Sequence, residues 1–503
     1  MVIYTSSRMD RFSKWTIGVF FILTLLVRLY AIQLPLWNTK EAFQIDLTRN
    51  LIKQNFNILK SEISFIPEHL SSQDALHPPY RWVEDFPLFH FLGALAMKLF
   101  NTESLFVGRI LSFIFFLIAT FFLYRFTYTH YGEVSACWAL VFWAQAPLLL
   151  AYSTWGMAEM AMMVSFLGAL YFISLYFDTK RNAYYWVALL CSIGIPAFRY
   201  YGAFLFIPLF FYWWNREAKM SLRLSCFFIL PLGIPLVWLL YSLTSVANPI
   251  TLHQKHENWH WGAWKLYLWD SFFYYEIMFS RFSQYILTYV GIGFFILGVV
   301  LNWRCLFLVS SLFMMVLSMG IFTLGHHNHE YYQIKFVPFL VILASTGVGY
   351  VFNKLKYLKR SILILTLVVL FLLSLGQAYK LLRYDSSGKV LGEKLAMISS
   401  PTDKIVMIQD VPDPAVLVYS QRQGWLKNKL FLKEKMQLPQ EASLLGIRFV
   451  SHPFELPDFL KDTYTILWQE RGPLGRQHKC GAIKFFFGPC ERDISTVMIL
   501  KPI

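Results

Sequence analysis

The sequence predicts a polytopic α-helical membrane protein of about 11 transmembrane helices, with a small α/β domain at the C-terminal end. Only 15% of the 503 residues are charged and 56% are hydrophobic, whereas ordinary globular domains carry roughly 25% charged residues. Apolar runs of bilayer length recur along the chain. Such runs must be helical, because lipid offers no partners to backbone amides. A large soluble helical protein is disfavoured, because too many of the apolar runs reach bilayer length.

The apolar runs set the predicted order of spans. The fifth and sixth runs are short, and a broken helix pair around Pro196–Arg199 is an alternative to two spans. The first run follows three basic residues, as in a signal peptide, but it is long and no small-residue cleavage site follows it, which favours an uncleaved span. The runs lie near 15–32, 105–123, 134–152, 157–177, 184–198, 201–214, 224–243, 283–301, 305–324, 336–352 and 361–379.

Basic residues in short loops predict the orientation. They recur in every second loop, so these loops and the N-terminus are expected in the cytoplasm. This accounts for the net charge of +15 without a nucleic-acid partner. The other side then receives residues 33–104 and everything after about residue 380. The basic residues are Arg8, Arg11, Lys14, Arg125, Lys180, Arg181, Arg216, Lys219, Arg223, Arg304, Lys354, Lys356, Lys359 and Arg360.

The prediction places two parts of the chain outside the lipid, namely the first outer loop of the membrane domain and a C-terminal domain. A membrane domain covers residues 1–380, and its first outer loop contains a helix over 42–51. The loop also has an apolar run over 86–100, which is short for a span and suits a helix lying on the membrane surface. Strands and a helix alternate from residue 381 to 503, which predicts an extracytoplasmic α/β domain. The strands are expected near 403–409, 448–451, 464–468, 483–487 and 496–500, and the helix over 412–421.

Polar residues gather where this topology predicts one surface. Ionisable groups in or beside a span are costly unless paired or hydrated, so Glu159 and Arg199 mark function by default. An acid–base pair that only ties helices together is the alternative, and loop acids are often merely solvated. The groups are Lys40, Glu41, Asp46 and Arg49; His77, Arg81, Glu84 and Asp85; Glu159; and Arg199 with the run His326–Tyr332, which includes His329 and Tyr331.

This collection suits transfer chemistry at a lipid surface. A carboxylate can take a proton from an acceptor hydroxyl, while Arg, Lys or His holds a phosphate leaving group. A lipid phosphate fits, because its tail lies in the bilayer. The histidine run also suggests a divalent metal, but it lacks a clear fixed third ligand. No cofactor is otherwise expected.

The cysteines bear on the compartment. Cys480 and Cys490 lie in the polar C-terminal region, where either a disulfide or two free thiols fits the sequence. The remaining cysteines lie in or beside apolar runs and are expected to pack as small residues.

Five elements in order resemble the membrane-embedded C-superfamily glycosyltransferases that use lipid-phosphate sugars. These include the dolichyl-phosphate-mannose protein mannosyltransferases and the lipid A aminoarabinose transferase. The resemblance covers roughly residues 10–350. The elements are Lys40-Glu41-Ala-Phe43 with Thr48-Arg49-Asn50; Glu84-Asp85-Phe-Pro87-Leu; Gly108-Arg109-Ile-Leu-Ser; Pro147-Leu, Tyr152-Ser and Glu159; and His329-Glu-Tyr-Tyr332 with Pro338.

The sequence departs from the family pattern at the first acid. Lys40 stands where the family usually has its leading catalytic Asp, and Glu159 stands for an Asp in the fourth span. The catalytic base is therefore expected to be Asp85 first and Glu41 second. Phe86 replaces the basic residue that often follows the second acid.

The resemblance implies an inverting glycosyltransferase of the inner membrane that works on the extracytoplasmic face. A polyprenyl-phosphate sugar would be the donor, and a glycolipid, glycan or protein hydroxyl the acceptor. Arg199, Arg49 and the His326–His329 region, with Tyr331 and Tyr332, would hold the phosphate, helped by Lys40 and Glu84, while Glu159 would position Arg199 or the acceptor. The alternatives are a transporter or flippase of a lipid-linked or anionic substrate, a non-catalytic homologue, and a structural membrane protein.

Overall fold

The computed structural model describes most of the chain as two compact units. The first comprises Met1–Ile32, Val83–Phe89 and Arg109–Leu381, and the second Gln33–Trp82, His90–Gly108 and Leu382–Ile503. The second unit therefore includes most of the predicted first outer loop. The described residues are 9–36, 39–66, 80–81, 85–219, 221–245, 271–354, 359–382, 386–410, 413–428, 439, 441–450, 458–461, 463–472 and 495–502.

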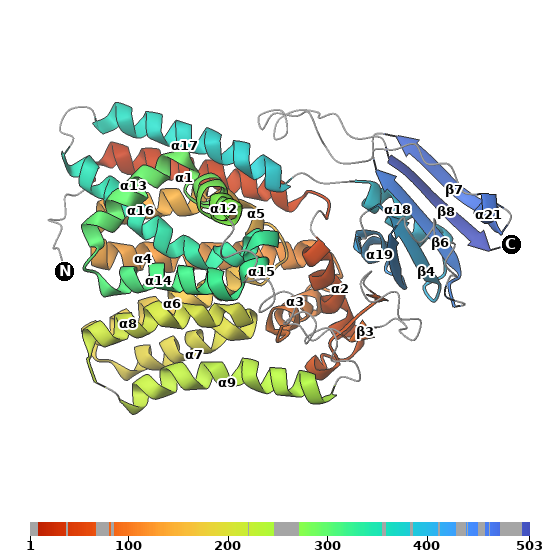
Figure 1. Ribbon diagram of the computed structural model, residues 1–503, viewed down its shortest axis with the longest axis horizontal. Helices are drawn as coiled ribbons and strands as arrows, with labels where there is room; N and C mark the ends of the chain where they lie inside the picture. The colour runs from red at the N-terminus through yellow and green to blue at the C-terminus, as the bar shows by residue number, and fades with distance from the viewer. Residues whose placement is uncertain are drawn as a thin grey trace. The chain divides into compact units, whose positions relative to one another are not determined.

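The first unit is a bundle of apolar helices (Figure 1). Every predicted apolar run coincides with helix. The elements are α1 (Arg11–Ile32), α4 (Phe106–Gln145), α5 (Pro147–Tyr152), α6 (Glu159–Thr179), α7 (Asn182–Phe198), η3 (Tyr200–Leu205), α8 (Phe206–Arg216), α9 (Leu222–Ser245), α12 (Ser271–Tyr274), η5 (Tyr275–Ile286), α13 (Thr288–Asn302), α14 (Leu306–Ile321), α15 (Thr323–Asn328), η6 (Glu330–Phe336), α16 (Val337–Lys354) and α17 (Lys359–Leu382).

The chain is a multi-pass membrane protein. Among the described residues, six helical segments are long and apolar enough to cross a bilayer, and the bent pair η5–α13 would add a seventh. The shorter apolar helices include α7 and α14, with 17 and 16 residues. At a rise of about 1.5 Å per residue these fall short of the hydrocarbon thickness, so the count of 11 spans stays a prediction.

A backbone kink separates two of the predicted spans. The second and third apolar runs join into α4, where Gly132 interrupts the helix with φ 83° and ψ 173°. This positive φ carries no steric penalty for glycine, which has no Cβ. The helix then ends before Pro147, which cannot continue its hydrogen bonds. Arg28 of α1 supplies a hydrogen-bond donor at this helix end, because its Nη2 donates to the Ala144 carbonyl at 2.8 Å. Its Nε donates to Ser153 Oγ at 2.9 Å.

Two glycines let α13 and α16 pack closely. A Cβ added at Gly298 would lie 1.8 Å from the Leu343 carbonyl oxygen, and one added at Gly347 would lie 2.1 Å from that of Phe294. Small residues at a helix crossing allow backbone contact of this kind in membranes. The pair therefore fixes where these helices cross.

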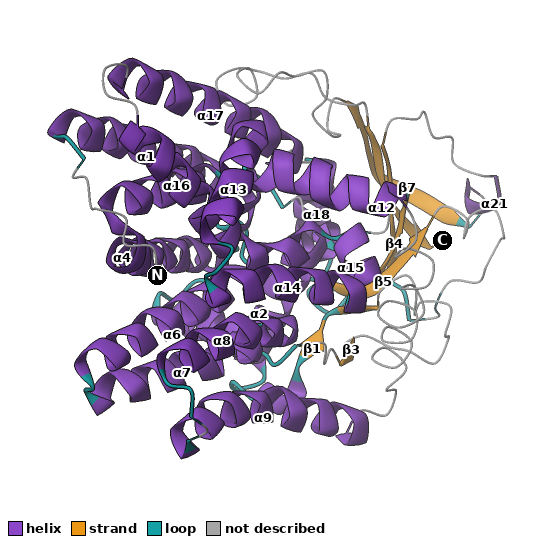
Figure 2. Cartoon of the chain, turned by 60° about the vertical axis from the view of Figure 1, so that its left-hand side comes forward, coloured by secondary structure: helices purple, strands orange, loops and turns teal. Residues whose placement is uncertain are grey.

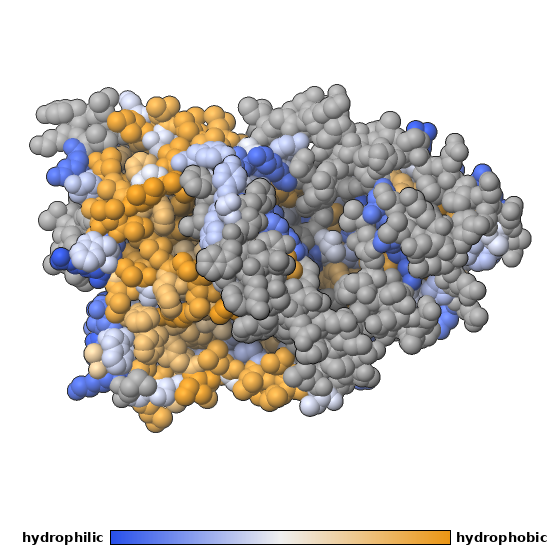
Figure 3. Space-filling model, viewed as in Figure 1, coloured by the Kyte–Doolittle hydropathy of each residue, from blue (hydrophilic) through white to orange (hydrophobic). Residues whose placement is uncertain are grey.

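The outward faces of the bundle are apolar. Large hydrophobic side chains of α9 and α17, such as Leu230, Leu236 and Leu365, are exposed. Figure 3 shows hydrophobic residues spread over the helices of this unit. Such a surface suits lipid contact.

The second unit is built on a mixed sheet. Its six strands run in the order β2-β5-β4-β6-β8-β7; the first four are parallel to their neighbours, and β8 is antiparallel to β6 and β7. Figure 2 shows these strands side by side. They are β2 (Phe65–Ile66), β5 (Gln423–Asn428), β4 (Lys404–Gln409), β6 (Leu444–Val450), β8 (Ser495–Pro502) and β7 (Tyr464–Gly472).

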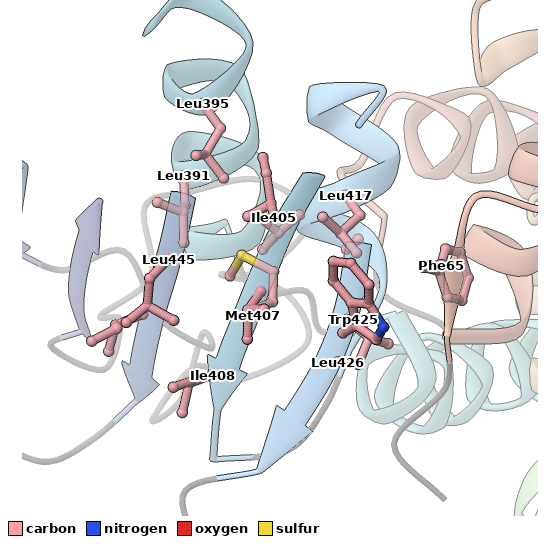
Figure 4. Close-up of a cluster of buried hydrophobic side chains, with 14 of the residues drawn as sticks. Phe65, Leu391, Leu395, Ile405, Met407, Ile408, Leu417, Trp425, Leu426 and Leu445 are labelled. Atoms are coloured by element: carbon pink, nitrogen blue, oxygen red, sulfur yellow. The ribbon is translucent and has the colours of Figure 1, made fainter. Parts of the chain in front are cut away.

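Helices cover the sheet and form its core. Leu391 and Leu395 of α18 (Ser387–Ile398) and Leu417 of α19 (Ala415–Ser420) lie over Ile405 and Met407 of β4 (Figure 4). The same core contains side chains from the first loop, including Ala42 and Ile45 of α2 (Thr39–Lys53). The remaining elements are η1 (Ile58–Lys60), the pair β1 (Glu62–Ile63) and β3 (Tyr80–Arg81), α3 (Leu88–Leu99) and α21 (Asp458–Lys461).

Most predicted elements of this unit are present. Strands β4, β6, β7 and β8 overlap the predicted strands, α19 lies within the predicted helix, and α2 and α3 overlap the two helices expected in the first loop. α3 exposes Leu95 and Leu99, as a membrane-surface helix would, and its place on the membrane stays a prediction. The strand expected near 483–487 and the cysteines Cys480 and Cys490 lie outside the described residues. The cysteines in the apolar runs are free.

Candidate active site

Arg199 lies at a break between two helices. α7 contains Pro196 near its end, and Arg199 follows with extended backbone, φ −149° and ψ 117°. Pro196 lacks the N–H that would continue the ladder, which favours a break here. The helix breaks at Arg199, and the short helix η3 leads on to α8. The alternative of one broken helix pair here, in place of two spans, stays a prediction.

Glu159 is the first residue of α6 and is fully buried. Negative side chains are favourable in the first turn of a helix, where unpaired N–H groups point outward. Its placement at a span end agrees with the sequence prediction.

Asp85, Arg199 and Glu159 form one buried ion-pair network. Arg199 Nη1 donates to Asp85 Oδ2 at 2.5 Å, and Arg199 Nη2 lies 2.8 Å from Glu159 Oε1. The side chains are 10%, 4% and 0% exposed respectively. Of the expected site residues, the structure brings these three together within the first unit. Two carboxylates share one guanidinium here, so the ionised network carries one excess negative charge.

The network keeps polar capacity for further contacts. Tyr201 donates its hydroxyl hydrogen to Glu159 Oε1 at 3.2 Å. Within the part of the chain that the structure describes, Glu159 Oε2 and Arg199 Nε have no hydrogen-bond partner. Buried polar atoms are almost always paired, so such atoms invite a ligand or water.

Aromatic side chains form a wall beside the network. Tyr332 lies 4.8 Å from Tyr201 and 4.9 Å from Tyr331, between ring centroids, and its hydroxyl lies 3.3 Å from that of Tyr200. His329 stacks on Tyr331 at 5.1 Å. The predicted residues His329, Tyr331 and Tyr332 thus stand next to Tyr201, which contacts Glu159.

His326 is held by its own surroundings. Its Nε2 lies 3.2 Å from Ser318 Oγ, and its Nδ1 lies 3.4 Å from Gln333 Nε2. The ring is buried and stacks on Phe336. These contacts favour a packing role, while its predicted phosphate contact stays a prediction.

A second charged cluster contains Glu276 and Arg281, which are not among the predicted site residues. Arg281 Nη2 lies 2.7 Å from Glu276 Oε1, and His327 Nδ1 lies 2.9 Å from Glu276 Oε2. Arg281 also donates to the carbonyls of His326 and His327. Glu276 and Arg281 are five residues apart, and the π-helical η5 brings such pairs together. Residues five apart do not share a face of an α-helix, so α-helical periodicity does not predict this pair.

The α2 residues belong to the second unit. Arg49 donates to the carbonyls of Glu103, at 2.9 and 3.0 Å, and of Val418, at 2.8 Å. It therefore ties α2 to the rest of this unit, while its predicted phosphate contact stays a prediction. Lys40 is half-buried and Glu41 fully buried on the same helix.

Asp46 is the buried acid of α2. Its Oδ2 accepts a hydrogen bond from the Ser64 N–H at 2.5 Å. Burial raises the pKa of this carboxyl above its ordinary value, and burial lowers the pKa of neighbouring Arg49. Asp46 therefore serves the packing of the first loop.

Three predicted residues have no described side chain. His77 and Glu84 lie outside the described residues, and Arg81 is described only through its backbone in β3. Across the described ranges, no group of three or more His, Cys, Asp or Glu side chains is placed to hold a metal ion. The predicted divalent metal thus has no assigned ligands.

Comparison with known proteins places the fold. Residues 77–242 match the model of the family described as dolichyl-phosphate-mannose-protein mannosyltransferase. ArnT from Cupriavidus metallidurans, in the apo state, has a similar fold, with a TM-score of 0.61 at 12% identity over 95% of this chain and 97% of that chain. No curated protein matches the sequence.

Ligand-bound structures are similar as well. ArnT bound to undecaprenyl phosphate has a TM-score of 0.60 at 11% identity, over 95% of this chain and 97% of that one. The oligosaccharyltransferase AglB from Archaeoglobus fulgidus, in complex with an inhibitory peptide and a dolichol-phosphate, has a TM-score of 0.53 at 10% identity, over 87% and 70%. The family match and the shared fold confirm the resemblance to membrane-embedded glycosyltransferases of the mannosyltransferase and ArnT type.

Proposed function

We propose that this protein is an inverting glycosyltransferase that moves a sugar from a polyprenyl-phosphate donor to a hydroxyl acceptor. The buried Asp85–Arg199–Glu159 network carries the proposal, because it joins a base to a phosphate-binding cation. The fold shared with proteins bound to undecaprenyl phosphate and dolichol-phosphate supports the donor class. The acceptor class, a glycolipid, glycan or protein, is proposed from the resemblance alone.

Asp85 is the proposed base. Its Oδ2 is held by Arg199, and Oδ1 takes the proton of the acceptor hydroxyl as the acceptor oxygen attacks the anomeric carbon. The bond from that carbon to the phosphate oxygen breaks, and the polyprenyl phosphate leaves with the electron pair. Attack from the opposite side inverts the anomeric carbon. Glu41 remains the second candidate for this role.

Arg199 and Glu159 prepare the leaving group. The guanidinium can share its charge with the departing phosphate, and its Nε donor is the one to reach it. Glu159 fixes the guanidinium through the 2.8 Å contact. The tyrosine wall beside the network offers aromatic faces and hydroxyls to the sugar. Lys40, Glu84 and His329 keep their proposed supporting roles at the phosphate.

The proposed chemistry needs no cofactor, because a carboxylate and a guanidinium supply the base and the counter-charge. We therefore expect transfer by the purified protein to continue in excess chelator. Abolition by the chelator, with recovery on adding a divalent metal, would contradict this.

The proposed location is the inner membrane, with the site and the C-terminal domain on the extracytoplasmic face. The alternation of basic loops supports this orientation. The C-terminal domain would help to select the acceptor.

Incubation with labelled polyprenyl-phosphate sugars tests the function. The protein in vesicles would meet a panel of donors, alongside Asp85→Asn and Glu41→Gln. Asp178→Asn is the matched control, because it removes an acid from another Asp–Arg pair, 3.6 Å from Arg216. We expect turnover by the wild type and the control, and loss in Asp85→Asn. Turnover that survives in both Asp85→Asn and Glu41→Gln would contradict the assignment.

The same vesicles test the transporter alternative. A transporter with paired repeats is expected to carry charges at mid-span. Glu159 instead begins α6 and Arg199 follows α7, which favours the enzyme. Movement of labelled donor across the vesicle without transfer or hydrolysis would favour the transporter.

A further inference from the structure

Lys335 is a buried cation that the proposed mechanism does not use. It is fully buried in η6, and its Nζ has no hydrogen-bond partner among the residues that the structure describes. Five aromatic rings surround it instead. The ring centroids lie 4.8 Å from Nζ for Tyr201, 5.4 Å for Phe204, 5.6 Å for Phe322, 5.5 Å for Tyr332 and 5.4 Å for Phe336.

This aromatic cage favours the charged ammonium. Ring faces attract a cation, and the attraction grows when water is excluded. A lone buried ammonium is nevertheless costly. An ammonium without a hydrogen bond stays charged there only if the aromatic rings and nearby negative charge offset the loss of water.

Two cage rings belong to the candidate site. Tyr201 donates to Glu159 at 3.2 Å, and Glu159 contacts Arg199. Tyr332 lies 4.8 Å from Tyr201 and its hydroxyl meets that of Tyr200. A continuous path thus runs from Lys335 through Tyr201 to the Asp85 pair.

The ion-pair network and the Lys335 ammonium carry opposite net charges. The ionised network of two acids and one guanidinium has one excess negative charge, and Lys335 supplies one positive charge behind Tyr201. Opposite charges stabilise each other more in an apolar interior than in water.

We infer that Lys335 is a positioning residue for the proposed reaction: its cage fixes Tyr201 and Tyr332, and its charge keeps the acids of the network ionised. The inference rests on the proposed function. The neighbouring charged or titratable groups are Tyr201 on η3, Tyr332 on η6, Glu159 on α6 behind Tyr201, His326 on α15 against the Tyr332 and Phe336 rings, and Arg281 on η5 at the His326 carbonyl.

Two substitutions separate charge from packing. Lys335→Met keeps length and apolar volume but removes the charge, whereas Lys335→Arg keeps the charge. Lys219→Met, at an exposed position after α8, is the control. Thermal unfolding of each variant checks that it folds.

The pH profile of transfer is the main readout. For Lys335→Met we expect kcat to fall about 10-fold or more, with KM for the donor within about 2-fold of wild type. The acidic limb of the profile should move to higher pH by about half a unit or more, because a base without a nearby cation protonates more easily. Lys335→Arg should return the acidic limb of the profile to its wild-type pH. A rate loss with an unmoved limb, or a wild-type profile in Lys335→Met, would overturn the inference.

An infrared titration of carboxyl groups needs no turnover. The carbonyl stretch of a protonated acid is followed against pH, and Asp85→Asn assigns the band. In Lys335→Met the Asp85 carboxyl should become protonated at a higher pH than in the wild type, and an unchanged titration of its band would overturn the inference. If the wild type transfers no sugar but the band shifts, only the proposed function fails.

Discussion

At the scale of residues, the central feature is one guanidinium shared by two buried acids. Arg199 contacts Asp85 and Glu159 through different nitrogens, at 2.5 and 2.8 Å. Only arginine presents several donors in a rigid fork, so lysine cannot hold both acids in this way. Removing one partner from a buried ion pair also leaves charge uncompensated. The geometry therefore depends on the identity of this residue.

Arg199→Lys should reduce transfer by at least about 100-fold, because the phosphate and both acids lose their shared partner. The measurement is the initial rate of transfer, with thermal unfolding as a check on folding. Arg216→Lys is the matched control, since its pair with Asp178 is partly exposed and such pairs contribute little. Equal rates in Arg199→Lys and the control would refute the role of the fork.

Asp46 predicts a pH dependence of stability. Burial raises its folded-state pKa, so the protonated acid favours the fold. That contribution is fully present below the unfolded pKa of about 3.9 and is lost as pH rises through the folded value. Asp46→Asn keeps an acceptor for the Ser64 N–H but cannot ionise. We expect its thermal stability relative to wild type to rise between pH 4 and pH 7, and an unchanged difference would contradict this.

At the scale of elements, the helix crossing of α13 and α16 is the sharpest constraint. Gly298→Ala would place a methyl group 1.8 Å from the Leu343 carbonyl oxygen, so the helices must separate. We expect a loss of about 2 kcal/mol, seen as a lower temperature of thermal unfolding. Gly293→Ala on the same helix meets no atom within 4 Å and should be neutral or stabilising. Equal effects of the two substitutions would contradict the close crossing.

Elements also show what the sequence could predict. Apolar length located the helices, and the rule that charges in spans mark function selected Glu159 and Arg199. The same rule applied to Lys335 would have found the cage. The pairing of Glu276 with Arg281 could not be predicted, because α-helical spacing does not bring residues five apart together. The pairing of β2 with β5 escaped because it links Phe65 to Gly424, and no local pattern encodes a partner so distant in sequence.

At the scale of the whole molecule, the basic loops predict the topology. Lys219 follows α8 on the expected cytoplasmic side, and Glu393 lies exposed on α18 in the expected extracytoplasmic part. In a background with the six native cysteines replaced, a membrane-impermeant maleimide added to intact cells should label Glu393→Cys but not Lys219→Cys. The opposite pattern, or equal labelling, would contradict the orientation.

The central claim is that Asp85 removes the acceptor proton while Arg199 holds the phosphate. A single-turnover experiment with donor already bound separates binding from chemistry. Asp85→Asn should retain donor, because Arg199 remains, and should form product at least about 100-fold more slowly than the wild type. Product formation by Asp85→Asn at the wild-type rate would contradict the claim.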